Sequence, residues 1–202
     1  MHQAGFVCAV EGLWHVGKTM LCRQLCDYYP SAEYITEPDH LILPSVDLGA
    51  ADIEMWYLDE WRRRAEQATN YKQSGKLVVM ERTLFSTLAY MAAIGRPIAI
   101  PMRSVSALPR SFLPDLVIVI DADSPRPELL PEAVLLRYKE AGVRIGDQSW
   151  LRMYKNALIS FMTENGIPLQ FIHGDLLSSR DYVLFDQAKI LLVKHLGVLS
   201  CS

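Results

Sequence analysis

The feature that most constrains this chain is a glycine-rich loop between a strand-like segment and a helix-like segment. The loop reads GLWHVGKT and matches the pattern G-x-x-x-x-G-K-[ST] at every fixed position. Residues 6–10 before it form an apolar run typical of a buried strand, and apolar residues recur with helical spacing from Met20 to Tyr28 after it. The chain must therefore fold so that a glycine turn ends a buried strand and opens a helix.

Such a loop predicts a phosphate site. Its backbone N–H groups and the positive end of the following helix stabilise phosphate oxygens. Lys18 can reach the terminal phosphates of a triphosphate, and the Thr19 hydroxyl can ligate Mg²⁺. The alternative, a surface turn before an ordinary helix, fits poorly with the buried-looking strand before it. The residues predicted to contact phosphate are Gly12, Leu13, Trp14, His15, Val16, Gly17, Lys18 and Thr19.

Strand-like and helix-like segments alternate along the chain. Apolar runs predict strands at residues 6–10, 33–36, 77–80, 116–120 and 169–172. Helical spacing predicts helices at residues 51–73, 83–94, 131–141, 148–164 and 180–195. This alternation is typical of a parallel sheet covered by helices on both faces, with ligands bound at the carboxyl ends of the strands. From the length of 202 residues we expect a single α/β domain spanning residues 1–202.

Two proline-containing stretches stand out from this alternation. Residues 95–114 hold four prolines and are predicted to form a long surface connection. Residues 124–147 begin with a proline-rich segment and carry Arg137, Lys139 and Arg144. We therefore expect the second stretch to be a mobile, basic lid.

Charge, hydropathy and cysteine usage limit the partners and the compartment. A net charge of −3 gives no general attraction to nucleic acid or to an anionic membrane. Apolar runs are shorter than the about 18 residues of a membrane span, and the start lacks a secretory pattern, so we expect a cytoplasmic protein. Cys22 and Cys26 could share a metal, but no second ligand pair lies nearby. Reduced thiols are the favoured interpretation for all the cysteines: Cys8, Cys22, Cys26 and Cys201.

Acidic residues follow the second and third predicted strands. Glu37 lies in the sequence Thr-Glu-Pro and is placed for general-base work or for gripping a substrate hydroxyl, although Glu-Pro also commonly begins a loop. Glu81 follows four apolar residues. This is the general form of a strand that delivers a carboxylate towards the Mg²⁺ of a phosphate-loop protein. The adjacent Arg82 can clamp a phosphate or stabilise charge on a transferring phosphoryl group. The alternative is a solvated acid–arginine pair at the start of a helix.

The order of these motifs resembles the thymidylate kinase and deoxynucleoside kinase group. The motifs that carry the resemblance are Val10-Glu11 before the loop, Thr-Glu-Pro at 36–38, Glu-Arg-Thr at 81–83, Ser86 with Ala89-Tyr90, and the sequence PDLVIVIDAD at 114–123. The resemblance implies a P-loop NTPase fold with a five-stranded parallel sheet and a small lid. It further implies a kinase that uses ATP and Mg²⁺, acts on a small-molecule phosphoryl acceptor such as a nucleoside or nucleotide, and dimerises through helices.

The resemblance also implies roles for particular residues. Glu37 corresponds to the glutamate near the 5′-hydroxyl of the acceptor, and Glu81 and Arg82 correspond to the acid–arginine pair beside Mg²⁺ and the acceptor. Arg144, with Arg137 as the weaker candidate, falls where the lid supplies arginines to the transferring phosphate. The predicted catalytic residues are Lys18, Glu37, Arg82 and Arg144, and the predicted metal ligands are Thr19 and Glu81. Asp175 follows the fifth strand, where backbone borders the adenine of ATP.

Departures from the family pattern concern the acceptor. Trp14 stands in the loop where thymidylate kinases usually have an aspartate, and the neighbouring His15 is also unusual. The run Arg62-Arg63-Arg64 replaces a clear arginine-centred substrate motif and is best interpreted as a solvated helix face. A kinase for an unusual metabolite stays an alternative, as does a nucleotide-binding or nucleotide-hydrolysing protein without kinase activity.

Overall fold

The computed structural model describes residues 5–38, 50–99, 103, 108–122, 128, 130–140, 143–174 and 183–199. A five-stranded sheet with the order β2-β3-β1-β4-β5 forms its centre, and every neighbouring pair is parallel. The strands are β1 (Phe6–Gly12), β2 (Glu33–Ile35), β3 (Leu77–Glu81), β4 (Leu116–Asp121) and β5 (Leu169–His173). The predicted α/β class and parallel sheet are confirmed, and β1, β3, β4 and β5 each continue one or two residues beyond the predicted apolar runs.

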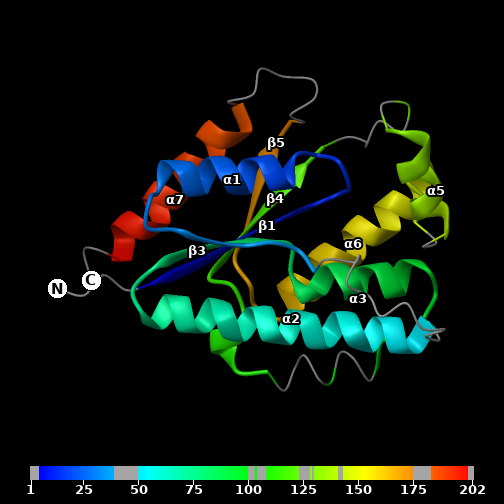
Figure 1. Ribbon diagram of the computed structural model, residues 1–202, viewed down its shortest axis with the longest axis horizontal. Coiled ribbons are helices and arrows are strands. Elements are labelled where there is room, and N and C mark those ends of the chain that lie inside the picture. The colour runs from blue at the N-terminus through cyan, green and yellow to red at the C-terminus, as the bar shows by residue number, and fades with distance from the viewer. Residues whose placement is uncertain are drawn as a thin grey trace.

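Helices cover both faces of the sheet, as the alternation predicts. Figure 1 shows α1 and α7 on one face, with α2, α3 and α6 on the other. The helices are α1 (Lys18–Tyr28), α2 (Ala50–Gln73), α3 (Leu84–Ala93), α5 (Glu132–Glu140), α6 (Gln148–Glu164) and α7 (Val183–Leu199). The 3-10 helix η2 (Arg110–Phe112) lies in the proline-containing connection before β4. None of the helices in the described ranges combines the length and the apolar character that a membrane span requires.

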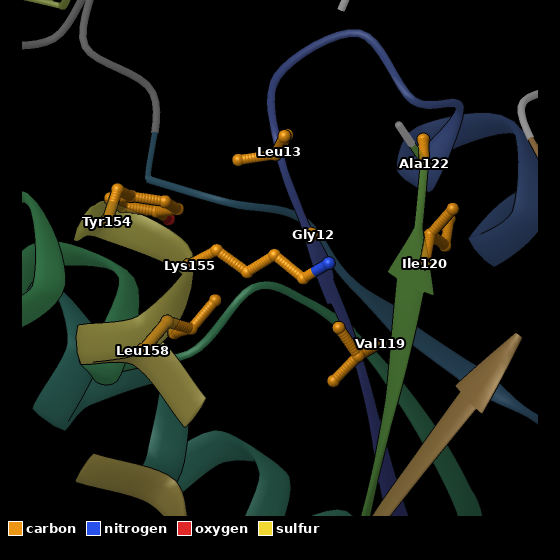
Figure 2. A pocket seen from close by; sticks show the side chains of 8 residues that line it. All are labelled: Gly12, Leu13, Val119, Ile120, Ala122, Tyr154, Lys155 and Leu158. Atoms are coloured by element: carbon orange, nitrogen blue, oxygen red, sulfur yellow. The ribbon is translucent and has the colours of Figure 1, made fainter. Parts of the chain in front are cut away.

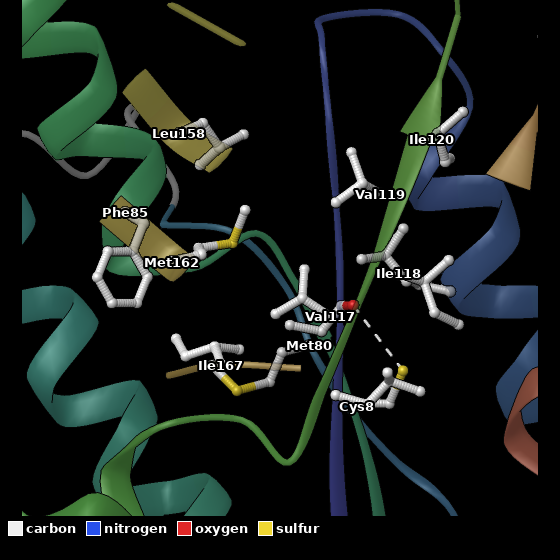
Figure 3. Packing of buried hydrophobic residues seen from close by; sticks show 14 of the residues in the cluster. Cys8, Met80, Phe85, Val117, Ile118, Val119, Ile120, Leu158, Met162 and Ile167 are labelled. Atoms are coloured by element: carbon white, nitrogen blue, oxygen red, sulfur yellow. Dashed lines mark hydrogen bonds between the residues drawn. The ribbon is translucent and has the colours of Figure 1, made fainter. Parts of the chain in front are cut away.

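Continuous apolar sequence in β1, β3 and β4 makes the centre of the sheet buried on both faces. Every residue of β1 and β3 is buried. Figure 3 shows Phe85 and Met162 packed on one face of β4, with Ile118 directed to the other. Each such fully buried side chain stabilises the fold by about 1.5–3 kcal/mol through removal of apolar surface from water. The rigid centre of the sheet holds the carboxyl ends of its strands in fixed positions.

The strand order places the glycine loop between the ends of two neighbouring strands. In the register of the sheet, Val10 pairs with Glu81 of β3 and Gly12 pairs with Ile120 of β4. The chain leaves β1 towards β2 on one side, whereas β4 and β5 lie on the other, so the strand order reverses at β1. In open parallel sheets this reversal marks the crevice where ligands bind.

The described cysteines are free thiols. Cys8 and Cys22 are buried and Cys26 is partly buried, and burial raises the pKa of each thiol above its ordinary value. A raised thiol pKa makes the reactive thiolate scarce at neutral pH. These three residues therefore behave as small core side chains, and Cys201 lies outside the described residues.

Candidate active site

Left-handed backbone at three positions gives the glycine loop its shape. Gly12, His15 and Gly17 have φ angles of 143°, 58° and 95°. A Cβ atom on Gly12 would lie 2.8 Å from the carbonyl oxygen of Ile120, so a larger residue would push the loop away from β4. Gly17 is the N-cap of α1 and has no side chain to occupy the first N–H groups of that helix. These N–H groups are therefore suited to an anion.

Lys18 lies beneath the loop, as the phosphate-site prediction requires. Its side chain is buried, and its Nζ donates a 2.5 Å hydrogen bond to the carbonyl oxygen of Leu13. Burial and the nearby charge of Arg82 lower the pKa of Lys18 to about 7, although Glu37, Glu11 and Glu81 oppose the shift. A phosphate group in the loop would supply the negative charge that this buried ammonium group needs.

Thr19 and Glu81 are far apart in sequence and adjacent in the site. The Thr19 hydroxyl donates to Oε1 of Glu81 at 2.5 Å, and the Tyr34 hydroxyl donates to Oε2 of the same carboxylate at 2.5 Å. A hydroxyl and a carboxylate are hard oxygen donors of the kind that Mg²⁺ prefers, so this pair fits the expected metal. Tyr34, on β2, was not predicted from sequence.

Arg82 is held in an unusual backbone conformation at the end of β3. Its φ angle is 63°, in the left-handed region that a non-glycine residue seldom adopts. The Arg82 N–H donates to the carbonyl oxygen of Val10 at 2.9 Å, which ties this conformation to β1. Such backbone costs of order 1–3 kcal/mol and persists only where its surroundings enforce it. The turn directs the guanidinium of Arg82 back towards the glycine loop.

The guanidinium of Arg82 binds several oxygens around the loop. Its Nε donates to Oε2 of Glu37 at 2.7 Å, and its Nη1 donates to Oη of Tyr154 at 3.1 Å and to the Gly12 carbonyl oxygen at 3.3 Å. Burial opposes its charge, but Tyr154, Glu37 and Glu11 together raise the pKa of Arg82. The predicted Glu37 and Arg82 are thus brought together, and Tyr154 from α6 is an additional partner.

Glu11 is a fully buried carboxylate immediately before the loop. Its Oε1 accepts from both the Thr83 N–H and the Thr83 hydroxyl at 2.7 Å, and its Oε2 accepts from the Ser86 hydroxyl at 2.7 Å. Burial raises the pKa of Glu11, and the charge of Arg82, whose Nη1 lies 4.0 Å away, lowers it. Glu11 joins β1 to the first turn of α3. The sequence motifs include all three residues but did not predict that they are in contact.

The three consecutive arginines of α2 divide into two kinds. Arg62 and Arg63 are exposed and pair with glutamates one turn away on the same helix, as the solvated-face interpretation predicts. Arg64 departs from that interpretation because its side chain is only 10% exposed. Its Nη2 donates to the main-chain oxygen of Glu37 at 3.2 Å and lies 3.8 Å from Oε2 of Glu60. Arg64 therefore supports the segment that carries Glu37.

Trp14, in the glycine loop, packs against aromatic residues of α6. Its ring centroid lies 4.6 Å from that of Tyr154 and 5.6 Å from that of Trp150. The centre of the Arg82 guanidinium lies 5.2 Å from the Trp14 ring, within the range of a cation–π contact. Half-buried His15 follows, and burial together with Lys18 and Arg82 lowers its pKa. His15 is therefore a weaker base than an ordinary histidine, although the charge of Glu37 opposes the shift.

A small crevice lies beside the loop at the ends of β1 and β4. It is partly open to solvent. Figure 2 shows Lys155 reaching from α6 towards the strand ends near Gly12. Lys155 forms an ion pair with Asp121, and Nδ1 of His173 lies 3.6 Å from the other Asp121 oxygen. The lining residues are Gly12, Leu13, Val119, Ile120, Ala122, Tyr154, Lys155 and Leu158.

Of the arginines predicted to act from the lid, the structure describes the side chain of Arg144 alone. Arg144 is exposed in the segment before α6, and within the described contacts only its main-chain oxygen has a partner, the Asp147 N–H at 2.9 Å. The backbone of Arg137 lies in α5, whereas its side chain and the whole of Asp175 lie outside the described residues. The roles predicted for these three residues stay predictions.

Comparison with known proteins identifies the fold. No family model and no curated protein sequence matches the chain. A thymidylate kinase from Ehrlichia chaffeensis superposes with a TM-score of 0.65 at 15% identity, covering 93% of this chain and 99% of that one. The chain has the thymidylate kinase fold. A thymidylate kinase from Candida albicans superposes with a TM-score of 0.61 at 14% identity, covering 96% of this chain and 93% of that one.

Proposed function

We propose that this protein is a kinase that transfers the γ-phosphoryl group of Mg·ATP to a nucleoside or a nucleoside monophosphate. One observation carries the proposal: two pairs of side chains of the kinds that phosphoryl transfer uses meet at the glycine loop. Thr19 contacts Glu81 on the metal side at 2.5 Å, and Arg82 contacts Glu37 on the acceptor side at 2.7 Å. Enzymes of this class depend on positioning and electrostatics more than on covalent chemistry.

On the donor side, the loop N–H groups and Lys18 would bind the β- and γ-phosphates. Thr19 and Glu81 would hold Mg²⁺, which neutralises phosphate charge when bound. The hydrogen bond from Lys18 to the Leu13 carbonyl holds the lysine under the loop until a phosphate replaces that partner. Lys18 then stabilises the negative charge that moves onto the leaving ADP.

On the acceptor side, an oxygen of the acceptor forms a bond to the γ-phosphorus as the bond between that phosphorus and the β,γ-bridging oxygen breaks. The electron pair of the broken bond leaves with ADP. Arg82 lies beside the loop and would stabilise the transferring group. Glu37 takes the proton if the acceptor is a hydroxyl, and positions the acceptor if it is a phosphate.

The named neighbours support the kinase class. Both are thymidylate kinases, and broad substrate specificity is attributed to the Candida albicans protein. The likeness to them rests on fold at 14–15% identity, and Trp14 replaces the aspartate usual in thymidylate kinases. We therefore extend the kinase class to this chain but not the thymidylate substrate.

The test is ADP production from Mg·ATP with a panel of nucleosides, nucleoside monophosphates and small alcohols. We expect ADP to appear only with an acceptor, and Lys18→Ala to lower turnover by about a thousandfold or more, since the lysine charge acts directly on the transferring phosphates. A circular dichroism spectrum like that of the unaltered protein would confirm that the variant folds. ADP release without any acceptor would instead favour a hydrolase, and the absence of turnover across the panel would favour a binding protein.

A further inference from the structure

Two of the three guanidinium nitrogens of Arg82, Nε and Nη1, are already hydrogen bonded within the protein, so neither two-nitrogen edge that includes Nη2 is wholly free for a ligand. Its Nε donates to Glu37 at 2.7 Å, and its Nη1 donates to Tyr154, Gly12 and Ser86 at 3.1, 3.3 and 3.4 Å. Trp14 lies over its face, with the ring centroid 5.2 Å from the guanidinium carbon. Only 8% of the Arg82 side chain is exposed. The cation best placed for an acceptor phosphate is therefore largely enclosed by the protein.

The charge exposed at this end of the site is negative. Glu37 binds Arg82 and yet leaves 45% of its side chain exposed. Capture of a phosphate dianion favours a free, planar guanidinium edge that can donate two parallel hydrogen bonds. A carboxylate in the same place repels the dianion but accepts a hydrogen bond from a hydroxyl. The pair as arranged favours a neutral hydroxyl acceptor.

Trp14 keeps Arg82 and Glu37 in this arrangement. The Trp14 ring is packed against Tyr154 at 4.6 Å and Trp150 at 5.6 Å between centroids, so it is supported from α6. Tyr154 both supports Trp14 and accepts a hydrogen bond from Arg82, so one residue of α6 orients both partners. A small residue at position 14 would uncover the guanidinium face, since the side chain over it would be gone.

We propose that Trp14 is a specificity-determining residue that shields Arg82 and restricts the acceptor to a neutral compound carrying a hydroxyl, such as a nucleoside. The inference rests on the proposed function, since it names the acceptor class of that site. It assigns a role to a side chain of the phosphate loop that the proposed function does not use to bind the donor phosphates. In the proposed function the loop would bind ATP through its backbone, Lys18 and Thr19, whereas the Trp14 side chain lies against Arg82.

Binding measurements test this without relying on turnover. We would titrate the protein, saturated with ADP, with the four common deoxynucleosides and their 5′-monophosphates by calorimetry. We expect the unaltered protein to bind at least one nucleoside more tightly than its monophosphate. Trp14→Ala should shift the ratio of the two dissociation constants towards the monophosphate by about tenfold or more, because it uncovers Arg82.

Two further variants control for folding and for loss of an aromatic ring. Trp14→Leu keeps apolar contact with α6 but cannot cover the guanidinium, so it should shift the ratio in the same direction and serves if Trp14→Ala does not fold. Trp150→Phe trims the neighbouring ring, whose buried indole nitrogen has no hydrogen-bond partner among the described residues. This variant should leave the ratio within about twofold of the unaltered protein, because Arg82 stays covered.

The outcomes separate this inference from the proposed function. An unchanged ratio in both Trp14 variants, tighter binding of monophosphates by the unaltered protein, or binding of neither class would overturn the inference. A shifted ratio without phosphoryl transfer to any acceptor would support the role of Trp14 and count against the kinase. Efficient transfer to monophosphates by the unaltered protein would support the kinase and count against the inference.

Discussion

The two halves of the candidate site are built in different ways. The donor half is mainly one continuous stretch, Gly12 to Thr19, with Glu81 added from the neighbouring strand. The acceptor half is assembled from the ends of β2 and β3 and from α2 and α6, through Glu37, Arg82, Arg64 and Tyr154. A motif can specify the first half by backbone conformation alone. The second exists only once distant segments have packed together.

The halves also differ in how they carry charge. In the donor half, the backbone N–H groups and Lys18 supply positive charge that suits a negatively charged ligand. In the acceptor half, Arg82 already has carboxylates from Glu37 at 2.7 Å and Glu11 at 4.0 Å. Removing one member of a buried charge network leaves the others unpaired, at a cost of about 3–5 kcal/mol where the pair is fully buried. We therefore expect acceptor-half variants to act through charge balance and donor-half variants through phosphate contact.

The largest effect within the acceptor half should come from Glu37→Gln. The amide cannot accept the proton of a hydroxyl acceptor, so kcat should fall by about a thousandfold, within the range typical of a lost general base. Steady-state kinetics with the best acceptor measure this. Glu33→Gln, at the far end of β2 where Glu33 pairs with Lys76, is the matched control and should leave kcat unchanged. A mild effect of Glu37→Gln would remove Glu37 from the role of base.

The donor half should show its own dependence on pH. Because the pKa of Lys18 is lowered to about 7, the buried lysine loses its proton as the pH rises above 7. A bound phosphate favours the charged form of Lys18, so ADP binding takes up a proton above pH 7. The affinity for ADP should therefore fall as the pH rises. The dissociation constant of ADP, measured in EDTA without Mg²⁺, should rise about tenfold per pH unit from pH 7 to 9. Lys18→Met should abolish this slope, and a flat profile in the unaltered protein would contradict the prediction.

The contrast between the halves explains what the sequence could predict. Strand positions followed from apolar runs because β1, β3 and β4 are buried on both faces. The nearness of Thr19 and Glu81 followed because carboxyl ends of parallel strands share one edge of the sheet. The fold and the donor half were therefore predictable from local pattern together with one rule of topology.

The supporting residues of the acceptor half were not predictable in this way. Tyr154 occupies an apolar position of α6 and its hydroxyl meets Arg82 across 72 residues of sequence. Arg64 differs from Arg63 only in the side of α2 on which it lies, which depends on how that helix packs. Glu11, Thr83 and Ser86 all stand in motifs that the sequence displays, but nothing in the sequence indicates that Glu11 contacts the other two.

Glu11→Gln should have a smaller effect than Glu37→Gln, because Glu11 acts through its neighbours. The amide oxygen can still accept from Thr83, so the fold should survive, although the melting temperature should fall because a buried charge partner of Arg82 is lost. Arg82 loses a charge partner 4.0 Å away, so we expect kcat to fall by about tenfold while KM for ATP changes little. A lower melting temperature with unchanged kcat would mean that Glu11 only supports the junction of β1 and α3.

The smallest effect should separate two adjacent arginines. Arg64→Met removes the hydrogen bond to the main-chain oxygen of Glu37 at 3.2 Å but keeps an apolar side chain against the core. The Glu37 segment should loosen, raising KM for the acceptor by about fivefold with little change in KM for ATP, since one hydrogen bond from a charged donor is lost. Arg63→Met is the matched control, because Arg63 is 62% exposed and its ion pair is with Glu60, one turn away on the same helix. Equal effects of the two variants would show that Arg64 belongs to the solvated face of α2, and the acceptor half would then end at Glu37 and Arg82.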